Sequence, residues 1–175
     1  KRWYLWAQKA PDITGNSNLY LCEMKNPWTQ KGEPVMLSKP EYDWECRGFW
    51  VNEGPAVLFH GNKLFISYSA SATDENYCMG LLWIDLNADP QNPLNWHKSP
   101  RPVFATSYEN RQYGPGHNSF TQTPEVEDVL VYHARNYTEI EGDPLYDPNR
   151  HTRLKLVRWD ENGMPYFGIP PADTL

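Results

Sequence analysis

The sequence predicts an all-β fold, and within that class a β-propeller built from four-stranded antiparallel blades. Three observations predict it: an internal repeat, short apolar segments of strand length between turn residues, and no 3.6-residue apolar period long enough for a substantial helix. The repeat is seen in three similar segments whose central residues Trp6, Tyr68 and Tyr132 lie 62 and 64 residues apart. A second landmark recurs in step, because residues 26–35 and 92–103 both hold Asn-Pro, Trp, Lys and Val in that order.

Within each repeat the pattern gives strands and turns in a fixed order. The first unit has a strand at residues 3–7. The middle unit has strands at residues 56–60, 64–70, 78–85 and 96–103, with Gly61-Asn62 as a tight turn after the first. The last unit has strands at residues 119–123, 129–135, 152–160 and 166–169, with an Asn162-Gly163 turn before the fourth.

Four antiparallel strands in about 65 residues describe one propeller blade, and a closed propeller needs at least four blades. We therefore expect residues 1–175 to form a partial β-propeller domain. Residues 1–48 would be the remainder of one blade, residues 49–112 a second blade and residues 113–175 a third, so the sequence would be incomplete. A β-sandwich is the alternative, although it would not require two landmarks to recur in register.

Composition excludes several classes of partner. The chain has 16 Lys and Arg against 22 Asp and Glu, a net charge of −6, and no basic run, so nucleic acid is not an expected partner. Its apolar stretches are far shorter than a membrane span, so no membrane partner is expected. Aromatic residues make up 14% of this polar chain. Flat rings beside polar groups favour sugar binding, although propeller cores also use such rings.

Two reactive side chains occupy equivalent places in successive repeats. Glu53 lies 15 residues before Tyr68, and His117 lies 15 residues before Tyr132. Because the innermost strands of all blades converge on the propeller axis, we expect Glu53 and His117 to face one pocket. A carboxyl group at the bottom of an aromatic funnel can serve as a general acid. The alternatives are a strand-end carboxylate bonded by backbone amides for Glu53 and a core imidazole for His117.

Three motifs in order along the chain carry a family resemblance. They are Asn-Glu-Gly-Pro at residues 52–55, Ser-Tyr-Ser-Ala-Ser-Ala-Thr at 67–73 with Asn-Tyr-Cys-Met-Gly at 76–80, and Gly-Pro-Gly-His-Asn-Ser at 114–119. With these motifs the chain resembles glycoside hydrolase family 43, and within it the exo-acting 1,5-α-L-arabinofuranosidases. The resemblance implies a five-bladed β-propeller, of which this chain supplies roughly three blades. It also implies removal of terminal α-L-arabinofuranosyl residues from arabinan or arabino-oligosaccharides.

The resemblance further implies roles for individual residues. Glu53 matches the general acid, and His117 matches a histidine beside a central metal ion, usually calcium, often held through water. Arg135 matches an arginine that reaches the sugar subsite near the acid, with an ion pair between blades as the alternative. Trp50 and Tyr77 are candidates for the walls of the pocket, although both also suit a core.

The implied reaction is hydrolysis with inversion, in which Glu53 protonates the leaving oxygen while a second carboxylate activates a water molecule across the ring. The family's Asp base and the Asp that orients the acid have no counterpart here, and we expect both upstream of Lys1. The chain alone is then expected to be inactive and to need the missing N-terminal blades. A β-xylosidase of the same family and a non-catalytic sugar-binding propeller are the alternatives. An extracellular and a bacterial cytoplasmic location both stay open.

Overall fold

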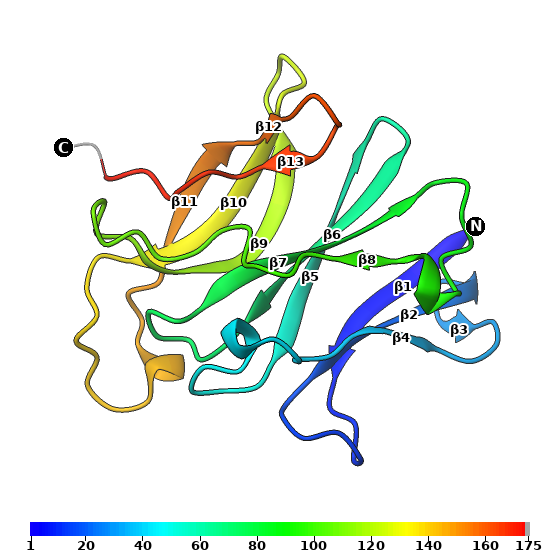
Figure 1. Cartoon of the computed structure of the whole chain (residues 1–175), viewed down its shortest axis with the longest axis horizontal. Helices are drawn as coiled ribbons and strands as arrows, with labels where there is room; N and C mark the ends of the chain where they lie inside the picture. Colours follow the sequence, from blue (N-terminus) through cyan, green and yellow to red (C-terminus); the bar gives the residue numbers. More distant parts are fainter. Residues whose placement is uncertain (174–175) are drawn as a thin grey trace.

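The computed structural model describes residues 1–173, which form three antiparallel β-sheets and a short β-hairpin (Figure 1). The N-terminal sheet contains β1 (Arg2–Gln8), β2 (Asn18–Asn26), β3 (Thr29–Gln30) and β4 (Val35–Ser38). The central sheet contains β5 (Asn52–His60), β6 (Lys63–Ala70), β7 (Cys78–Asp85) and β8 (His97–Lys98). The third sheet contains β9 (Tyr113–Gln122), β10 (Asp128–Arg135) and β11 (His151–Leu156), and the hairpin pairs β12 (Arg158–Trp159) with β13 (Pro165–Tyr166).

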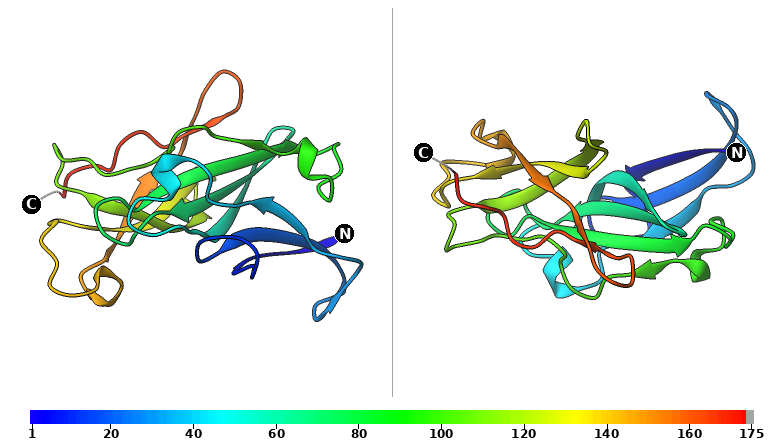
Figure 2. Two further views of the ribbon diagram at one scale, coloured as in Figure 1. Left: turned by 60° about the horizontal axis from the view of Figure 1, so that its bottom comes forward. Right: turned by 90° about the horizontal axis from the view of Figure 1, so that it is seen from above.

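The sheets follow one another across the molecule in chain order, so that the N-terminal and third sheets lie on opposite sides of the central sheet (Figures 1 and 2). The central sheet has the order β5-β6-β7-β8 and the third sheet the order β11-β10-β9, as expected for strands joined by consecutive turns. Helical structure among the described residues is limited to three single turns, η1 (Asp43–Glu45), η2 (Pro93–Asn95) and η3 (Pro144–Tyr146). The all-β prediction is confirmed.

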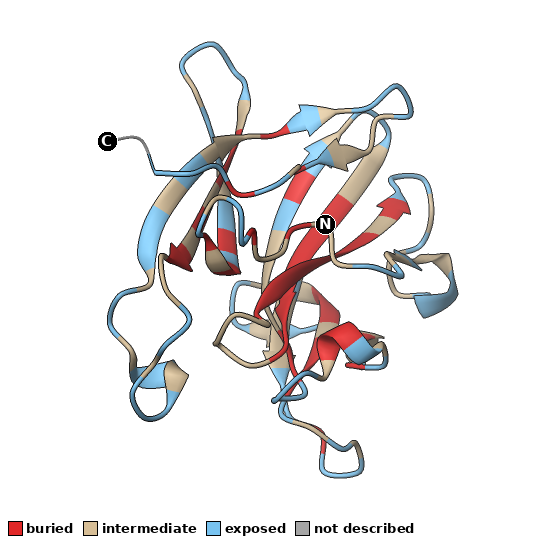
Figure 3. Cartoon of the chain, turned by 60° about the vertical axis from the view of Figure 1, so that its left-hand side comes forward, coloured by how far each residue is buried: buried red, intermediate tan, exposed pale blue. Residues whose placement is uncertain are grey.

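The central sheet is buried on both faces. Phe65 of β6 joins a buried cluster with Leu130 and Tyr132 of the third sheet. The next residue, Ile66, points the other way and joins a cluster with Leu19 of the N-terminal sheet. Buried residues therefore gather along the middle strands (Figure 3). The sheets pack as three successive layers, which differs from the β-sandwich considered as the alternative.

Most predicted strands are confirmed with somewhat different bounds. The prediction for residues 78–85 coincides with β7, and those for residues 56–60, 64–70 and 129–135 fall inside β5, β6 and β10. The turn at Gly61-Asn62 joins β5 and β6 as expected. The strand predicted at residues 3–7 falls inside β1.

Three predicted strands are wrong in extent. The strand predicted at residues 166–169 is reduced to the two-residue β13, which ends at Tyr166. Residues 96–103 form only the two-residue β8, because Pro100 and Pro102 lack the N–H groups that a longer ladder needs. Residues 152–160 divide into β11 and β12 at Val157, whose side chain turns into the core while its N–H donates to the Asp128 carbonyl at 2.8 Å.

The three sheets occupy separate stretches of the chain, residues 2–38, 52–98 and 113–156. The predicted limit at residue 49 falls between the first two stretches, and residue 113 is the first residue of the third. The division into blades stays a prediction. Within the described residues no helix is long and apolar enough to cross a bilayer. The three cysteines, Cys22, Cys46 and Cys78, are unpaired.

A buried carboxylate ties the loop before β5 to the central sheet. Glu45 is fully buried, and its Oε1 accepts hydrogen bonds from the Asn52 side-chain amide at 3.0 Å and the Tyr68 hydroxyl at 2.8 Å. Its Oε2 accepts from the Lys98 ammonium group at 2.9 Å and from two backbone N–H groups of the same loop. Burial, followed by the Glu45 carboxylate, raises the pKa of Tyr68 well above its ordinary value, so the hydroxyl stays a donor.

Asn52, which binds Glu45, also forms hydrogen bonds with the N-terminal sheet and the loop that leads into it. Its side-chain oxygen accepts from the Ser38 hydroxyl at 2.7 Å, and its backbone N–H donates to the Ser17 carbonyl at 3.0 Å. The Asn52 carbonyl in turn accepts from the Ser17 hydroxyl at 3.0 Å. Since Glu53 follows directly in β5, these hydrogen bonds fix the backbone from which the Glu53 side chain extends.

Replacement of Glu45 by Ala should lower the free energy of unfolding by about 3–5 kcal/mol, because Lys98 and the buried donors lose their shared partner. Urea unfolding of the purified chain measures this loss. Glu41→Ala is the matched control, since Glu41 is exposed and binds the same ammonium group at 3.2 Å. It should cost less than about 1 kcal/mol. Equal, small losses in both variants would contradict the anchoring role of Glu45.

Candidate active site

The structure brings Glu53 and His117 together, as the repeat predicts. Oε1 of Glu53 lies 3.9 Å from Nδ1 of His117. Their strands, β5 and β9, belong to neighbouring sheets and pack side by side. Gly54 permits the approach, because a Cβ at this position would lie 3.2 Å from the His117 ring and its φ of +55° disfavours other residues. Glu53 and His117 therefore lie close together from neighbouring sheets, and a shared pocket at the propeller axis stays a prediction.

The hydroxyl of Tyr77 lies between these two side chains. It donates to Oε1 of Glu53 at 2.6 Å and lies 3.2 Å from Nδ1 of His117. Burial, followed by the Glu53 carboxylate, raises the pKa of Tyr77 well above its ordinary value, so the phenol keeps its proton. A phenol has one proton, and we assign it to the shorter contact; Nδ1–H of His117 then donates to the phenol oxygen. In the neutral imidazole, this tautomer leaves the lone pair on Nε2 of His117.

His117 sits on a bulge of β9. Its φ is +46°, a left-handed conformation that is uncommon outside glycine, and the pairing of β9 with β10 shifts register on both sides of His133. Two serines of β6 hold the bulge: the Ser69 hydroxyl accepts from the His117 N–H at 2.7 Å, and the Ser67 hydroxyl donates to the Asn118 side chain at 2.9 Å. The backbone of the third sheet is thus fastened to the central sheet beside Glu53.

The Glu53 carboxyl group is held on one oxygen and open on the other. Its side chain is 29% exposed, and the neighbouring His117 side chain is 56% exposed. Oε1 is bound by Tyr77, whereas Oε2 makes no hydrogen bond with any residue that the structure describes. One carboxyl oxygen is therefore available to a molecule arriving from solvent.

Tyr77 is buried between two neighbours from the third sheet. Its ring stacks on the His133 ring at a centroid distance of 5.6 Å and an interplanar angle of 9°. A Cβ on Gly116 would lie 2.6 Å from the Tyr77 ring, so only glycine fits there without displacement. Burial, followed by the nearby Arg150 charge, lowers the pKa of His133 to about 3. His133 is neutral, and its buried ring nitrogens have no partner among residues 1–173.

Of the two other predicted substrate-binding residues, Arg135 is buried in an ion pair and Trp50 is exposed to solvent. The Arg135 side chain is 2% exposed and pairs with the Asp147 carboxylate at 3.1 Å. It also donates to the carbonyls of Thr73, in the preceding predicted blade, and Pro144. Trp50 is 44% exposed two residues before β5, with Gly15 packed against it. The substrate-binding roles of Arg135 and Trp50 stay predictions.

The described residues offer few metal ligands. No group of three His, Cys, Asp or Glu side chains within residues 1–173 is arranged to hold a metal ion. Beside Glu53, the candidate donor is Nε2 of His117. A single imidazole fits an ion that keeps most of its water molecules and does not fit a cage built from protein ligands.

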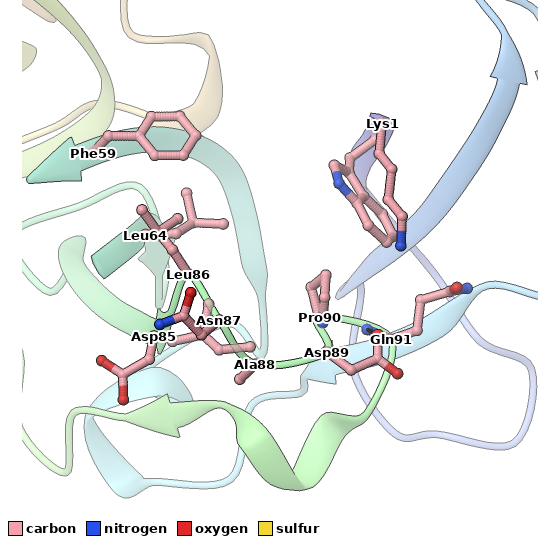
Figure 4. A pocket seen from close by; sticks show the side chains of 12 residues that line it. Lys1, Phe59, Leu64, Asp85, Leu86, Asn87, Ala88, Asp89, Pro90 and Gln91 are labelled. Atoms are coloured by element: carbon pink, nitrogen blue, oxygen red, sulfur yellow. Dashed lines mark hydrogen bonds between the residues drawn. The ribbon is translucent and has the colours of Figure 1, made fainter. Parts of the chain in front are cut away.

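A cavity of about 740 Å³ lies at the other end of the central sheet (Figure 4). Phe59 and Leu64 line it near the β5–β6 turn, together with residues 84–91 and, across the gap, Lys1. Glu53 begins β5 whereas Phe59 lies near its end, so this cavity is separate from the candidate site.

Comparison with known proteins assigns the family. The model of glycosyl hydrolases family 43 matches residues 1–165. The chain belongs to this family. Within the family 43 chain described here, the three motifs of the resemblance meet in space: Glu53 comes from the first, Ser69 and Tyr77 from the second, and His117 from the third.

The relatives with high identity are arabinofuranosidases. An extracellular exo-α-(1→5)-L-arabinofuranosidase of Streptomyces avermitilis is 54% identical over 99% of the chain, and α-L-arabinofuranosidase 43 of Humicola insolens is 48% identical over 98%. The chain spans 36% of each of these relatives. The crystal structure of α-L-arabinofuranosidase from Lactobacillus brevis is 57% identical and has a TM-score of 0.96, covering 99% of this chain and 54% of that one.

Sequence reasoning missed three residues that shape this family 43 site. Ser69 holds the His117 backbone, Gly116 makes room for Tyr77, and His133 supports the Tyr77 ring. A signal was present for Ser69, because Ser67 and Ser69 alternate on one face of an otherwise apolar strand. No sequence signal marks His133, which lies inside a strand with ordinary alternation.

Replacement of His133 by Phe should flatten the acid dependence of stability. In the unfolded chain His133 takes up a proton near its ordinary pKa of 6.5, whereas in the folded chain its pKa is lowered to about 3. The free energy of unfolding therefore falls as the pH drops from 6.5 towards 3. One such proton gives a slope of about 1.4 kcal/mol per pH unit. Urea unfolding between these pH values should show the slope reduced in His133→Phe.

At neutral pH the His133→Phe variant should be as stable as the parent or more so, because Phe keeps the stacking surface and removes two unpaired polar atoms. The same exchange at the exposed His151 is the control and should leave the pH dependence unchanged. An unaltered slope in His133→Phe would show that His133 does not take part in acid unfolding.

Proposed function

We propose that this chain is part of an exo-acting α-L-arabinofuranosidase that removes terminal arabinofuranosyl residues from arabinan or arabino-oligosaccharides with inversion. The observation that carries the proposal is the Glu53 carboxyl group, held by Tyr77 on one oxygen and open on the other. The identity of 54% to a relative named for this activity supports the substrate class. A xylan β-1,4-xylosidase from Bacillus halodurans shares 16% identity and supports the fold alone.

The proposed fold is a five-bladed β-propeller to which this chain contributes roughly three blades. Three sheets packed in chain order, with Glu53 and His117 meeting from adjacent sheets, support this arrangement. The TM-score of 0.96 against 54% of the Lactobacillus brevis enzyme is consistent with a chain that supplies part of a larger domain.

In the proposed mechanism Glu53 donates a proton from its open oxygen to the leaving glycosidic oxygen. The base that activates water and the Asp that orients the acid are assigned to N-terminal blades outside this chain, so the chain needs those blades for turnover. Trp50, exposed three residues before Glu53, is assigned to the wall of the sugar pocket. Arg135 is assigned to the neighbouring sugar subsite, with its present contacts holding the loop beside it.

Replacement of Glu53 by Gln in the longest natural protein that contains this chain should lower kcat on arabinan by about 10²–10⁴-fold. The loss should be far smaller on an aryl arabinofuranoside, whose leaving group needs no protonation. Steady-state rates on both substrates measure the effect. The 175-residue chain alone should show no turnover. Equal losses on both substrates would remove Glu53 from the acid role and favour a sugar-binding one.

Calcium is the proposed metal, held near His117 largely through water. The free Nε2 lone pair supports a ligand or water contact at this point, and the lack of a ligand cluster within residues 1–173 supports a hydrated ion. Such an ion would supply positive charge at the propeller axis.

Calorimetric titration of the metal-depleted full-length protein with CaCl₂ should show one site that His117→Ala weakens by about 10–100-fold. His151→Ala, a change at an exposed histidine of β11, should leave calcium binding unchanged. Tight binding of zinc through several protein side chains, or calcium binding unaffected by His117→Ala, would contradict the proposal.

A further inference from the structure

Within the described residues, a single hydrogen bond holds the Glu53 carboxyl group. Among the described residues, the Tyr77 hydroxyl is the one group bonded to this side chain, and the distance of 2.6 Å is short for a hydroxyl and a carboxyl oxygen. The geometry points to Tyr77 as a positioning residue of the general acid that this chain itself supplies, rather than the wall of the sugar pocket that the sequence suggests.

Tyr77 is suited to this role because its hydroxyl cannot move far. The residue is fully buried. Its ring is confined by His133 on one face and by the Gly116 backbone, where a Cβ would come within 2.6 Å. A donor fixed by packing holds its acceptor in one place, whereas a mobile donor would follow the carboxyl group.

The hydrogen bond also selects which oxygen does the chemistry. Because the Tyr77 hydroxyl occupies Oε1, the proton that Glu53 transfers resides on Oε2, the oxygen without a partner among residues 1–173. Nδ1–H of His117 meets the same phenol oxygen, so Tyr77 links the acid to the histidine that approaches from the next sheet. Loss of the hydroxyl would free the carboxyl group to rotate and turn its proton away from the substrate.

This inference rests on the proposed function, and its test is Tyr77→Phe in the longest natural protein that contains the chain. Phe keeps the ring that stacks on His133 and removes only the donor. We expect kcat on arabino-oligosaccharides to fall by about 10–100-fold with KM changed by less than about threefold. Across a series of aryl arabinofuranosides, the loss should grow as the leaving group becomes more basic, because a misplaced acid matters most there.

Tyr68→Phe is the matched control. Tyr68 is equally buried and donates to the Glu45 carboxylate at 2.8 Å, but Glu45 is fully enclosed. The two variants remove the same kind of hydrogen bond and should lose similar stability in thermal unfolding, yet Tyr68→Phe should keep the leaving-group dependence of the parent. A Tyr77→Phe enzyme whose loss is the same for all leaving groups, or no larger than that of Tyr68→Phe, would overturn the positioning role.

Glu53→Gln separates this failure from failure of the proposed function. If Glu53→Gln shows the leaving-group signature and Tyr77→Phe does not, Glu53 is the acid and Tyr77 does not position it. If neither variant shows the signature, or the parent hydrolyses no arabinofuranoside, the proposed function itself fails. A crystal structure of Tyr77→Phe with the Glu53 carboxyl group unmoved would also count against the inference.

Discussion

Burial of the central sheet on both faces is the constraint on which the rest of the structure depends. A sheet packed between two others cannot leave polar groups to water, so each must find a partner inside the protein. The apolar part of this requirement is met by residues such as Phe65 and Ile66, which point to opposite neighbours. The polar part is met by hydrogen bonds that cross from one sheet to the next, as Ser67 and Ser69 do with β9.

Two tyrosine–carboxylate pairs follow the rule that buried polar groups need partners. One of the two carboxyl groups is structural and the other is reactive. Tyr68 donates to Glu45, whose two oxygens are fully engaged and fully enclosed. Tyr77 donates to Glu53, whose second oxygen has no partner among residues 1–173 and whose side chain is 29% exposed. A carboxylate with every lone pair satisfied stabilises the fold and has nothing left for a substrate. The Glu53 carboxyl group has one oxygen left unbonded by the described residues, and this oxygen can react with a substrate.

The repeat in the sequence could locate Glu53 and His117 because it fixes backbone position, and equivalent positions of successive sheets converge. It could not identify the partner of Glu53, since Tyr77 lies 24 residues further on and reaches the site through packing against His133. Nor could it predict the full length of β9, because Gly114 and the left-handed His117 form a bulge whose residues suggest a loop. The predicted extent of the strand at residues 96–103 was also wrong, because Pro100 and Pro102 interrupt its pairing.

The features that the sequence could not reveal are also those that lower stability. A left-handed non-glycine residue such as His117 costs about 1–3 kcal/mol, and the buried ring nitrogens of His133 lack partners. Both lie within the packing that surrounds Tyr77 and Glu53, whereas Glu45 and Asn52, a few residues away, are fully paired. Selection for stability alone would place an ordinary strand residue at His117 and an apolar ring at His133. The strained His117 and the unpaired His133 both lie against Tyr77, which binds Glu53, and a catalytic role for Glu53 would explain why they are kept there. The fully paired network around Asn52 holds the surrounding backbone rigid.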